Sequence, residues 1–205
     1  MTRSDAELLT AHLAGDQTAF GELFTRHKDR LWAVSLRTTG NPEDAADALQ
    51  DALISAYRRA DSFRGDAQVS TWLHRVVVNA ALDRLRRNKV RLANPITDDM
   101  DFESPEPGPS EVAVSASVRD TVLAALDQLP PDQKAALVLV DMEGFSMQEA
   151  AAILDAPQGT IKSRCSRGRV KLAQILRPLL DDATETDAGA SDSHRVNPRL
   201  EGGAP

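Results

Sequence analysis

The stretch FSMQEAAAILDAPQGTIKSRCSRGRVKL, residues 145–172, reads as two helices joined by a tight turn. Ser146 and Glu149 form a Ser-x-x-Glu box, which is typical of a helix start. Pro157 ends the first helix, because the residue before a proline is disfavoured in helical geometry. The second helix is rich in Arg and Lys. This order is typical of a helix-turn-helix, whose second helix enters the major groove of DNA.

The second helix of this stretch has an apolar stripe and a polar face. The stripe recurs at intervals of four and three residues and consists of Ile161, Cys165, Gly168, Leu172 and Ile175. Opposite it lie Ser163, Ser166 and Arg167, which we predict to reach base edges. The flanking cations, predicted to meet phosphates, are Lys162, Arg164, Arg169 and Lys171. A solvated basic helix is the alternative, and charge alone would favour it; the box, turn and stripe together favour DNA.

Composition favours small helical units. The chain has 205 residues, enough for one large or two small domains, with 41% hydrophobic but only 4% aromatic residues. No apolar run approaches the ~20 residues of a membrane span, and no secretory leader is seen, so we expect a cytoplasmic protein that is not membrane-bound. The single cysteine, Cys165, excludes an internal disulfide and is predicted to be a small core residue.

The net charge of −7 is unevenly distributed. Residues 94–111 hold six acids and no Lys or Arg, and residues 181–205 hold six acids against two arginines. The rest of the chain is therefore mildly basic, at +3. Neutralisation of phosphates by basic residues supplies most non-specific DNA binding. A positive charge this small therefore predicts that the protein alone binds DNA weakly and needs a partner protein to hold it.

Four helices are predicted before residue 94, over about residues 4–14, 18–37, 41–56 and 70–90. Asn41 and Pro42 open the third with acids in its first turn. His27 falls on the apolar face of the second and is predicted to be a core histidine. The fold class is therefore all-α, with two small domains and the helix-turn-helix in the second. The predicted limits are 1–93, an acidic linker 94–117, a second domain 118–180 and a disordered acidic tail 181–205.

Several stretches, in this order and spacing, resemble the extracytoplasmic function (ECF) group of bacterial RNA polymerase sigma factors, and a sigma-M-like branch is one candidate within it. Residues 41–53 (NPEDAADALQDAL) look like the helix that grips the polymerase clamp. Residues 63–87, including STWLHRVVVNAALDRLRR, look like the loop and helix that open the −10 promoter element. Residues 129–131 (LPP) and 159–164 (GTIKSR) look like the −35-binding domain. Asp155 departs from the glycine common at the turn, but Asp tolerates left-handed geometry better than most residues.

The resemblance implies three sets of site residues. Those implied to bind core polymerase are Asp44, Asp47, Gln50, Asp51 and Leu53. Those implied to bind the −10 element are Phe63, Arg64, Ser70, Thr71, Trp72, Asn79, Arg84, Arg86 and Arg87. Those at the −35 element are Thr160, Lys162, Ser163, Arg164, Ser166, Arg167, Arg169 and Lys171. The alternatives that involve no binding role are a solvated acidic face for the aspartates, a core position for Trp72 and a solvated position for Asn79.

The function implied is that of a sigma factor, which directs core RNA polymerase to promoters and assists their melting. Its implied partners are core RNA polymerase, promoter DNA and an anti-sigma factor, in a stress response, with no enzymatic activity, cofactor, metal or small-molecule substrate. One rival is a free-standing regulator that binds duplex DNA without polymerase; a gel shift with and without core polymerase separates the two. Another is a Mg²⁺-dependent helical hydrolase using Asp44, Asp47 and Asp51, testable by a Mg²⁺-dependent thermal shift.

Overall fold

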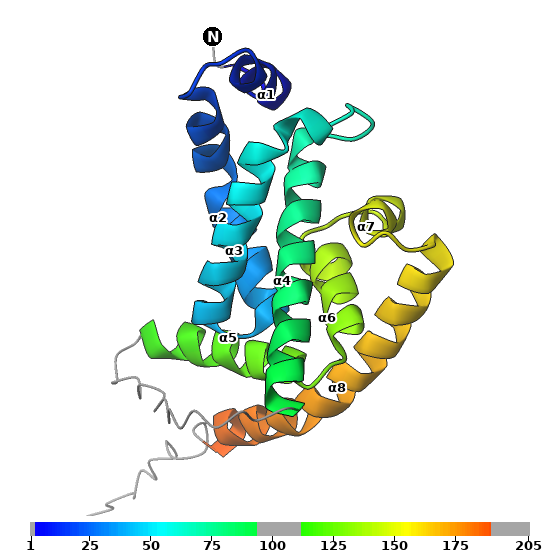
Figure 1. Cartoon of the computed structure of the whole chain (residues 1–205). Helices are drawn as coiled ribbons and strands as arrows, with labels where there is room; N and C mark the ends of the chain where they lie inside the picture. The colour runs from blue at the N-terminus through cyan, green and yellow to red at the C-terminus, as the bar shows by residue number, and fades with distance from the viewer. Residues whose placement is uncertain (1–2, 94–111, 190–205) are drawn as a thin grey trace, which may run out of the picture.

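The computed structural model describes residues 3–93 and 112–189, and every regular element within these residues is a helix (Figure 1). The N-terminal unit, residues 3–93, contains α1 (Asp5–Leu13), α2 (Ala19–Thr39), α3 (Pro42–Arg58), the 3-10 turn η1 (Ala60–Ser62) and α4 (Val69–Ala93). The C-terminal unit, residues 112–189, contains α5 (Val112–Asp127), α6 (Pro131–Leu137), the π-helical turn η2 (Val138–Met142), α7 (Met147–Ile153) and α8 (Gln158–Gly189). The all-α prediction is confirmed.

Local signals fix the starts and ends of the N-terminal helices. Ser4 and Glu7 form a reciprocal capping box at the start of α1. Gly40 ends α2 with φ of 92°, a left-handed conformation that costs glycine little. Asn41 then caps α3 by accepting a hydrogen bond from the Asp44 amide at 2.7 Å. The result is a bundle in which α2, α3 and α4 lie side by side (Figure 1).

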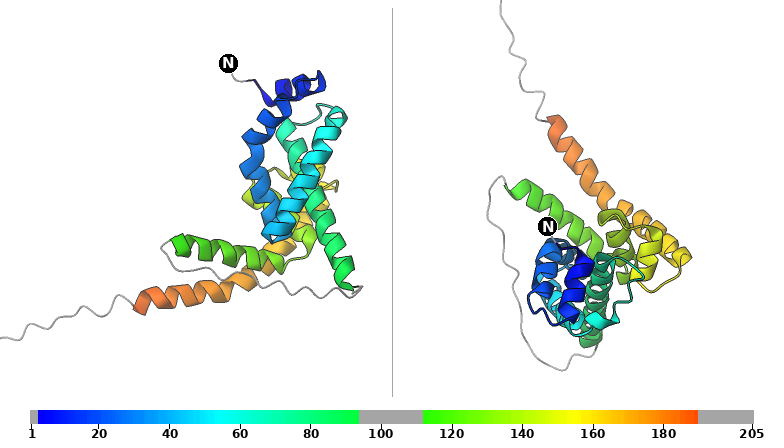
Figure 2. Two further views of the ribbon diagram at one scale, coloured as in Figure 1. Left: turned by 60° about the vertical axis from the view of Figure 1, so that its left-hand side comes forward. Right: turned by 90° about the horizontal axis from the view of Figure 1, so that it is seen from above.

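The two units share a hydrophobic core. Val34 of α2 and Val78 and Leu82 of α4 are buried in the same cluster as the apolar residues of α6, η2, α7 and α8. In Figure 1, α6 and α7 lie against α4 on the side away from α3. Figure 2 shows α5 and the end of α8 extending in one direction away from the bundle. The units are thus folded against each other.

This contact explains why α4 is more buried than its sequence pattern predicts. The sequence spacing predicts one inward face, Leu73, Val76, Val77 and Ala80. Leu73 and Val77 are buried and Val76 and Ala80 half-buried, but His74, Val78 and Leu82 are buried as well. A helix that packs against partners on two sides buries two faces, so a single stripe describes only one of them. The second face of α4 is the one that receives the C-terminal unit.

Three boundaries and orientations differ from the sequence predictions. Helix α5 begins at Val112, inside the predicted linker, and α8 continues to Gly189, inside the predicted disordered tail. The first extension consists of Val, Ala and Ser, and the second mainly of Asp, Glu, Thr and Ala. A helix tolerates these residues once neighbouring turns have formed. The spacing of Ala135, Val138, Leu139 and Met142 predicts that Met142 faces inward, but it is 39% exposed, because it ends η2, whose wider turn changes the helical period. The rest of the linker and tail, residues 94–111 and 190–205, lies outside the described residues.

Candidate nucleic-acid interface

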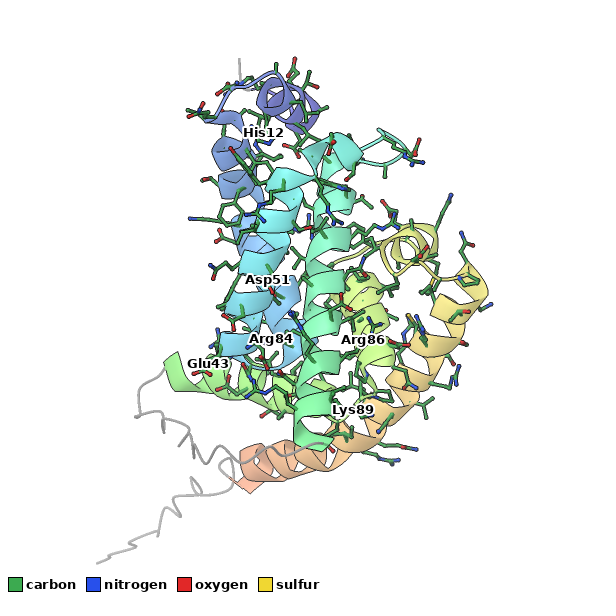
Figure 3. The ribbon with its side chains drawn as sticks, viewed as in Figure 1. His12, Glu43, Asp51, Arg84, Arg86 and Lys89 are labelled. Atoms are coloured by element: carbon green, nitrogen blue, oxygen red, sulfur yellow. The ribbon has the colours of Figure 1, made fainter. Side chains whose placement is uncertain are left out.

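Acidic residues of α3 face basic residues of α4 along the seam between the two helices. The Arg84 guanidinium bridges Asp44 and Asp47, at 2.7 Å to a carboxylate oxygen of each. Asn88 donates to the other oxygen of Asp44 at 2.8 Å. One turn further along α3, Asp51 lies 3.5 Å from the Arg87 guanidinium. Figure 3 shows Asp51 and Arg84 on these adjoining helices.

Asp44 is the anchor of this seam. It is only 9% exposed, at the N-terminal end of α3. Burial alone would raise the pKa of its carboxyl group, but the hydrogen bonds from Arg84 and Asn88 outweigh burial and hold the pKa below its ordinary value. The same contact raises the pKa of Arg84. Asp44 therefore serves the α3–α4 junction rather than an outer surface.

The other residues implied at the polymerase-binding helix lie nearer to solvent. Asp47, Gln50 and Asp51 are exposed, and Leu53 is half-buried. Sequence reasoning missed the exposed Ile54, although it is a large apolar residue one position after Leu53. The exposed ring of Tyr57 follows on the same helix. This surface combines carboxylates with apolar side chains.

A groove of about 780 Å³ runs between α3 and α4. Its walls contain Trp72, Asn79, Arg86 and Arg87 from the implied −10 set. Arg59, at the end of α3, and Arg75, within α4, also line it and were missed, because no local pattern brings either of them together with the rest of the site. Amide, indole and guanidinium groups are those that bind bases and single-strand backbone.

A second pocket, of about 410 Å³, lies beneath the loop that joins α3 to α4. Phe63, Arg64, Thr71 and Trp72 line it, with the Phe63 and Trp72 ring centroids 5.8 Å apart. Thr71 is 5% exposed, and Ser70, which does not line this pocket, is half-buried at the start of α4. Ala152 and Ile153 of α7, in the C-terminal unit, also line the pocket, so both units contribute to it.

Helix α8 has the two predicted faces. Ile161, Cys165 and Gly168 are buried, and burial raises the pKa of the Cys165 thiol, as fits a core residue. A side chain at Gly168 would meet Leu137, since a Cβ there would lie 2.8 Å from its Cδ1. The exposed positions of the implied −35 set are Lys162, Ser166, Arg167, Arg169 and Lys171, and the half-buried ones are Thr160, Ser163 and Arg164.

Two of the cations on α8 are already paired within the unit. Arg164 lies 2.6 Å from the Asp132 carboxylate, and Arg169 makes two hydrogen bonds to Asp141, at 2.7 and 2.9 Å. Arg167 instead bonds back to Ser163 of its own helix, with its guanidinium exposed. Arg167 thus keeps its charge available at the outer face.

The turn before α8 is built as its sequence indicates. Ser146 and Glu149 make the reciprocal capping box that starts α7. Asp155 takes a left-handed conformation, with φ of 48°, where glycine would be less strained. Together α7, this turn and α8 form the predicted helix-turn-helix.

The seam does not support a magnesium site on α3. The carboxylates of Asp44, Asp47 and Asp51 are each turned to an arginine of α4. Within residues 3–93 and 112–189, no group of three or more His, Cys, Asp or Glu side chains is placed to hold a metal ion. Nor does any helix in those ranges combine the length and the apolarity that crossing a bilayer requires.

The fold and these surfaces define a helical transcription initiation factor. Residues 23–91 match the family model of sigma-70 region 2, and residues 119–172 match that of sigma-70 region 4. The chain is 49% identical to the ECF RNA polymerase sigma factor SigM of Mycobacterium tuberculosis H37Rv, over 85% of each chain. It is 34% identical to the ECF RNA polymerase sigma-E factor of Escherichia coli K12, over 86% of this chain and 96% of that one. The chain belongs to the ECF group of RNA polymerase sigma factors, and so directs core RNA polymerase to promoters.

Solved structures agree with this fold. The sigma factor RpoE of Bartonella quintana, in complex with the anti-sigma factor NepR, is 26% identical, with a TM-score of 0.61 over 78% of this chain and 98% of that one. CnrH, in complex with the cytosolic domain of CnrY, is 26% identical, with a TM-score of 0.63 over 85% of this chain and 97% of that one.

Proposed function

We propose that three surfaces divide the work of this sigma factor. The exposed side of α3 binds core RNA polymerase, the α3–α4 groove with the adjoining loop binds the −10 element, and the outer face of α8 reads the −35 element. The observation that carries the proposal is the α3–α4 seam. It sets exposed carboxylates beside a groove lined by arginines and an amide, so that polymerase and a DNA strand can be held on adjoining faces.

The polymerase-binding surface consists of Asp47, Gln50 and Asp51 with the apolar side chains of Leu53 and Ile54. Exposed ion pairs contribute only about 0–1 kcal/mol each, so the carboxylates give orientation and the apolar contact gives most of the affinity. Asp44 supports this surface from beneath through Arg84.

The −10 surface combines the groove and the loop pocket. Opening a promoter requires bases to leave the stack, at a cost of a few kcal/mol per step, so a receiving site needs polar groups and a face for stacking. Phe63 and Trp72 supply faces, and Asn79 supplies an amide. Arg86 and Arg87 hold the strand backbone. Ser70 and Thr71 lie at one end of the site, at the start of α4, and Arg84 lies towards the other end, where it bonds to Asp47.

Replacing Asn79 with alanine is expected to relax base choice within the −10 element. Its exposed amide lies in the groove wall, and a well-placed amide–base pair discriminates by about 1–3 kcal/mol. Runoff transcription from templates varied through the −10 element measures the effect. Asp83→Ala, at an exposed position lining the same groove, is the matched control and should leave the preference intact. An unchanged preference in Asn79→Ala removes Asn79 from the reading surface.

On α8, Ser163, Ser166 and Arg167 face base edges, and Lys162 and Lys171 face phosphates. Thr160 sits at the start of the helix, where backbone amides also favour phosphate. Arg164 and Arg169 hold α8 onto Asp132 and Asp141 and add to the positive field around the helix.

Replacing Arg167 with alanine is expected to weaken −35 selectivity by about 1–3 kcal/mol at one position, because its charge is exposed on the reading face. Lys171→Ala serves as the comparison: loss of a phosphate contact should weaken all sequences alike and reduce the salt slope by about one. Holoenzyme binding to a library of −35 variants at several salt concentrations distinguishes the two. Equal losses on every sequence for Arg167→Ala contradict its assignment.

The proposed functional limits remain 1–93 for polymerase and −10 binding, 94–117 for the linker, 118–180 for −35 binding and 181–205 for the tail, although α5 begins before the third of these and α8 ends after it. Control by an anti-sigma factor within a stress response is supported by the fold shared with the NepR-bound sigma factor. Because the docking partner is RNA polymerase, the proposed place of action is the cytoplasm. We assign no catalytic residue and no cofactor.

In vitro transcription with core polymerase and a genomic template library, followed by sequencing of the start sites, tests the proposal. We expect initiation at a set of promoters that share two spaced elements. A protein that shifts duplex DNA in a gel without polymerase, and gives no initiation with it, would instead be a free-standing regulator.

A further inference from the structure

The contact between the two units contains a partly buried polar cluster as well as the shared apolar core. Glu143, at the end of η2, has a side chain only 6% exposed and accepts hydrogen bonds from Arg30 and Arg37 of α2. Arg30 also donates to the Glu143 backbone carbonyl at 3.2 Å. These contacts join residues more than 100 positions apart in the chain. We call this cluster, together with His74 and Phe145, the latch.

His74 of α4 is the titratable residue at the centre of the latch. It is 0% exposed, and its ring packs edge-on against Phe145 of the C-terminal unit, with centroids 4.9 Å apart. Nδ1 lies 2.7 Å from the Ser70 carbonyl, so Nδ1 carries the hydrogen and donates it. Nε2 is buried without a hydrogen-bond partner. The geometry therefore suits a neutral imidazole.

The latch holds the two DNA-reading surfaces close together. Ala152 and Ile153 of α7 line the same 410 Å³ pocket as Phe63 and Trp72. Thr160, the first −35 residue, follows Ile153 by seven residues, roughly 25 Å of extended chain at most. Promoter elements named −10 and −35 lie about 25 positions apart, roughly 85 Å of duplex at about 3.4 Å per pair. The units must separate for both elements to be bound together.

We propose that His74 makes this latch sensitive to pH: protonation of its buried Nε2 releases the C-terminal unit from the N-terminal unit, so mild acid frees the two DNA-reading surfaces. A protonated imidazole would place an N–H group and a positive charge where no acceptor is available. The consequence for promoters rests on the proposed function, but the opening itself does not.

The charged groups around His74 agree with this direction. Burial has the largest effect on the pKa of His74 and lowers it. The hydrogen bond to the Ser70 carbonyl raises this pKa, as does the charge of Glu143. The charges of Arg30 and His27 lower it. Glu143 is already shared by two arginines.

Charged side chains on the other elements packed against α4 are engaged elsewhere. On α6, Lys134 pairs with Asp127. On α7, Glu149 caps its own helix. Asp5 of α1 bonds to His27, and Asp44 of α3 is bound by Arg84. None of these carboxylates is free to receive a protonated His74.

The sign of the pH effect follows. In the closed form, in which the latch joins the two units, the pKa of His74 lies below its ordinary value. In the open form the ring is exposed to water and its pKa returns to the ordinary value of about 6.5. The stabilisation of the closed form is therefore complete above about pH 6.5 and is lost as the pH falls through the closed-form pKa. Each unit of difference between the two pKa values changes the closed-to-open ratio by up to tenfold.

Energy transfer between dyes at Lys28→Cys and Gln174→Cys, on exposed positions of α2 and α8, measures opening in the full chain without polymerase or DNA. Cys165 is fully buried, so labelling selects the introduced thiols. We expect transfer to fall between pH 7.5 and 5.5 while helical circular dichroism at 222 nm is retained. His74→Phe and His74→Asn, neither of which titrates, should stay flat, whereas His12→Asn, in a histidine away from the latch, should follow the parent.

Transfer that does not change with pH in the parent protein overturns the proposal. A fall in energy transfer that both His74 variants show as strongly as the parent protein also overturns the proposal. Two different substitutions are used so that one poorly folded variant does not decide the result. Runoff transcription with core polymerase at pH 7.5 tests the proposed function separately, because it does not depend on the pH response.

Discussion

Replacing Asp47 with arginine is expected to abolish co-elution of the protein with core RNA polymerase, with at least a tenfold loss of affinity, about 1.4 kcal/mol. The Asp47 side chain is 51% exposed on α3, in the middle of the surface proposed to meet a basic partner. The substitution changes the local charge by two. It also places a guanidinium beside Arg84, whose own guanidinium lies 2.7 Å from Asp47 in the parent protein. Both effects repel a positively charged surface.

Asp29→Arg provides the matched control for this experiment. It makes the same change in charge at an exposed position on α2, away from the α3 surface. We expect that variant to co-elute with core polymerase as the parent does. If Asp47→Arg also co-elutes at the parental level by size exclusion, the α3 face is not where polymerase binds.

Replacing Asp44 with alanine is expected to lower the free energy of unfolding by about 2–4 kcal/mol, because it leaves a partly buried Arg84 with one of its two carboxylates missing. Asn88 loses its acceptor as well. Urea unfolding followed by circular dichroism measures the change. Asp47→Ala, which removes the exposed carboxylate from the same arginine, should cost no more than about 1 kcal/mol.

The cost of losing Asp44 should also depend on pH. The folded-state pKa of Asp44 lies below its ordinary value, so the ionised carboxylate contributes its full stabilisation above about pH 4. That contribution is lost as the pH falls through the folded-state pKa. The difference between parent and Asp44→Ala should hold from pH 7 to 5 and narrow below about pH 4. A difference that is constant down to pH 3 shows that the charge of Asp44 is not what stabilises the seam.

The helix-turn-helix was predictable because its signals are local. The Ser146 box, the Asp155 turn and the stripe through Ile161 and Cys165 each involve residues within a few positions of one another. The α3–α4 seam was less accessible, although its spacing held a clue. Asp47 and Asp51 are four apart and Arg84 and Arg87 three apart, so each pair lies on one face of its helix; the structure joins Asp47 to Arg84 and Asp51 to Arg87.

The contact between the units could not be predicted from the sequence. Arg30 and Arg37 meet Glu143 over more than 100 residues, and no local pattern reports that distance. The burial of His74 has the same origin: its ring faces the C-terminal unit rather than the core of its own helix bundle. His27 also differs from a core histidine, since its half-buried Nε2 lies 2.6 Å from a carboxylate oxygen of Asp5.

The wide turn η2 has a further consequence for how the two units are aligned. It accommodates one more residue than an α-helical turn would, and the Glu143 amide closes it on the Val138 carbonyl at 2.9 Å. Deleting one residue there would rotate everything downstream by about 100° about the helix axis. Helices α6 and α8, which share one core within the C-terminal unit, would lose their fit, and Glu143 would point away from the arginines of α2. The length of this one turn therefore works as a spacer: it sets the angular register of α7 and α8 against α6 and aims Glu143 at α2.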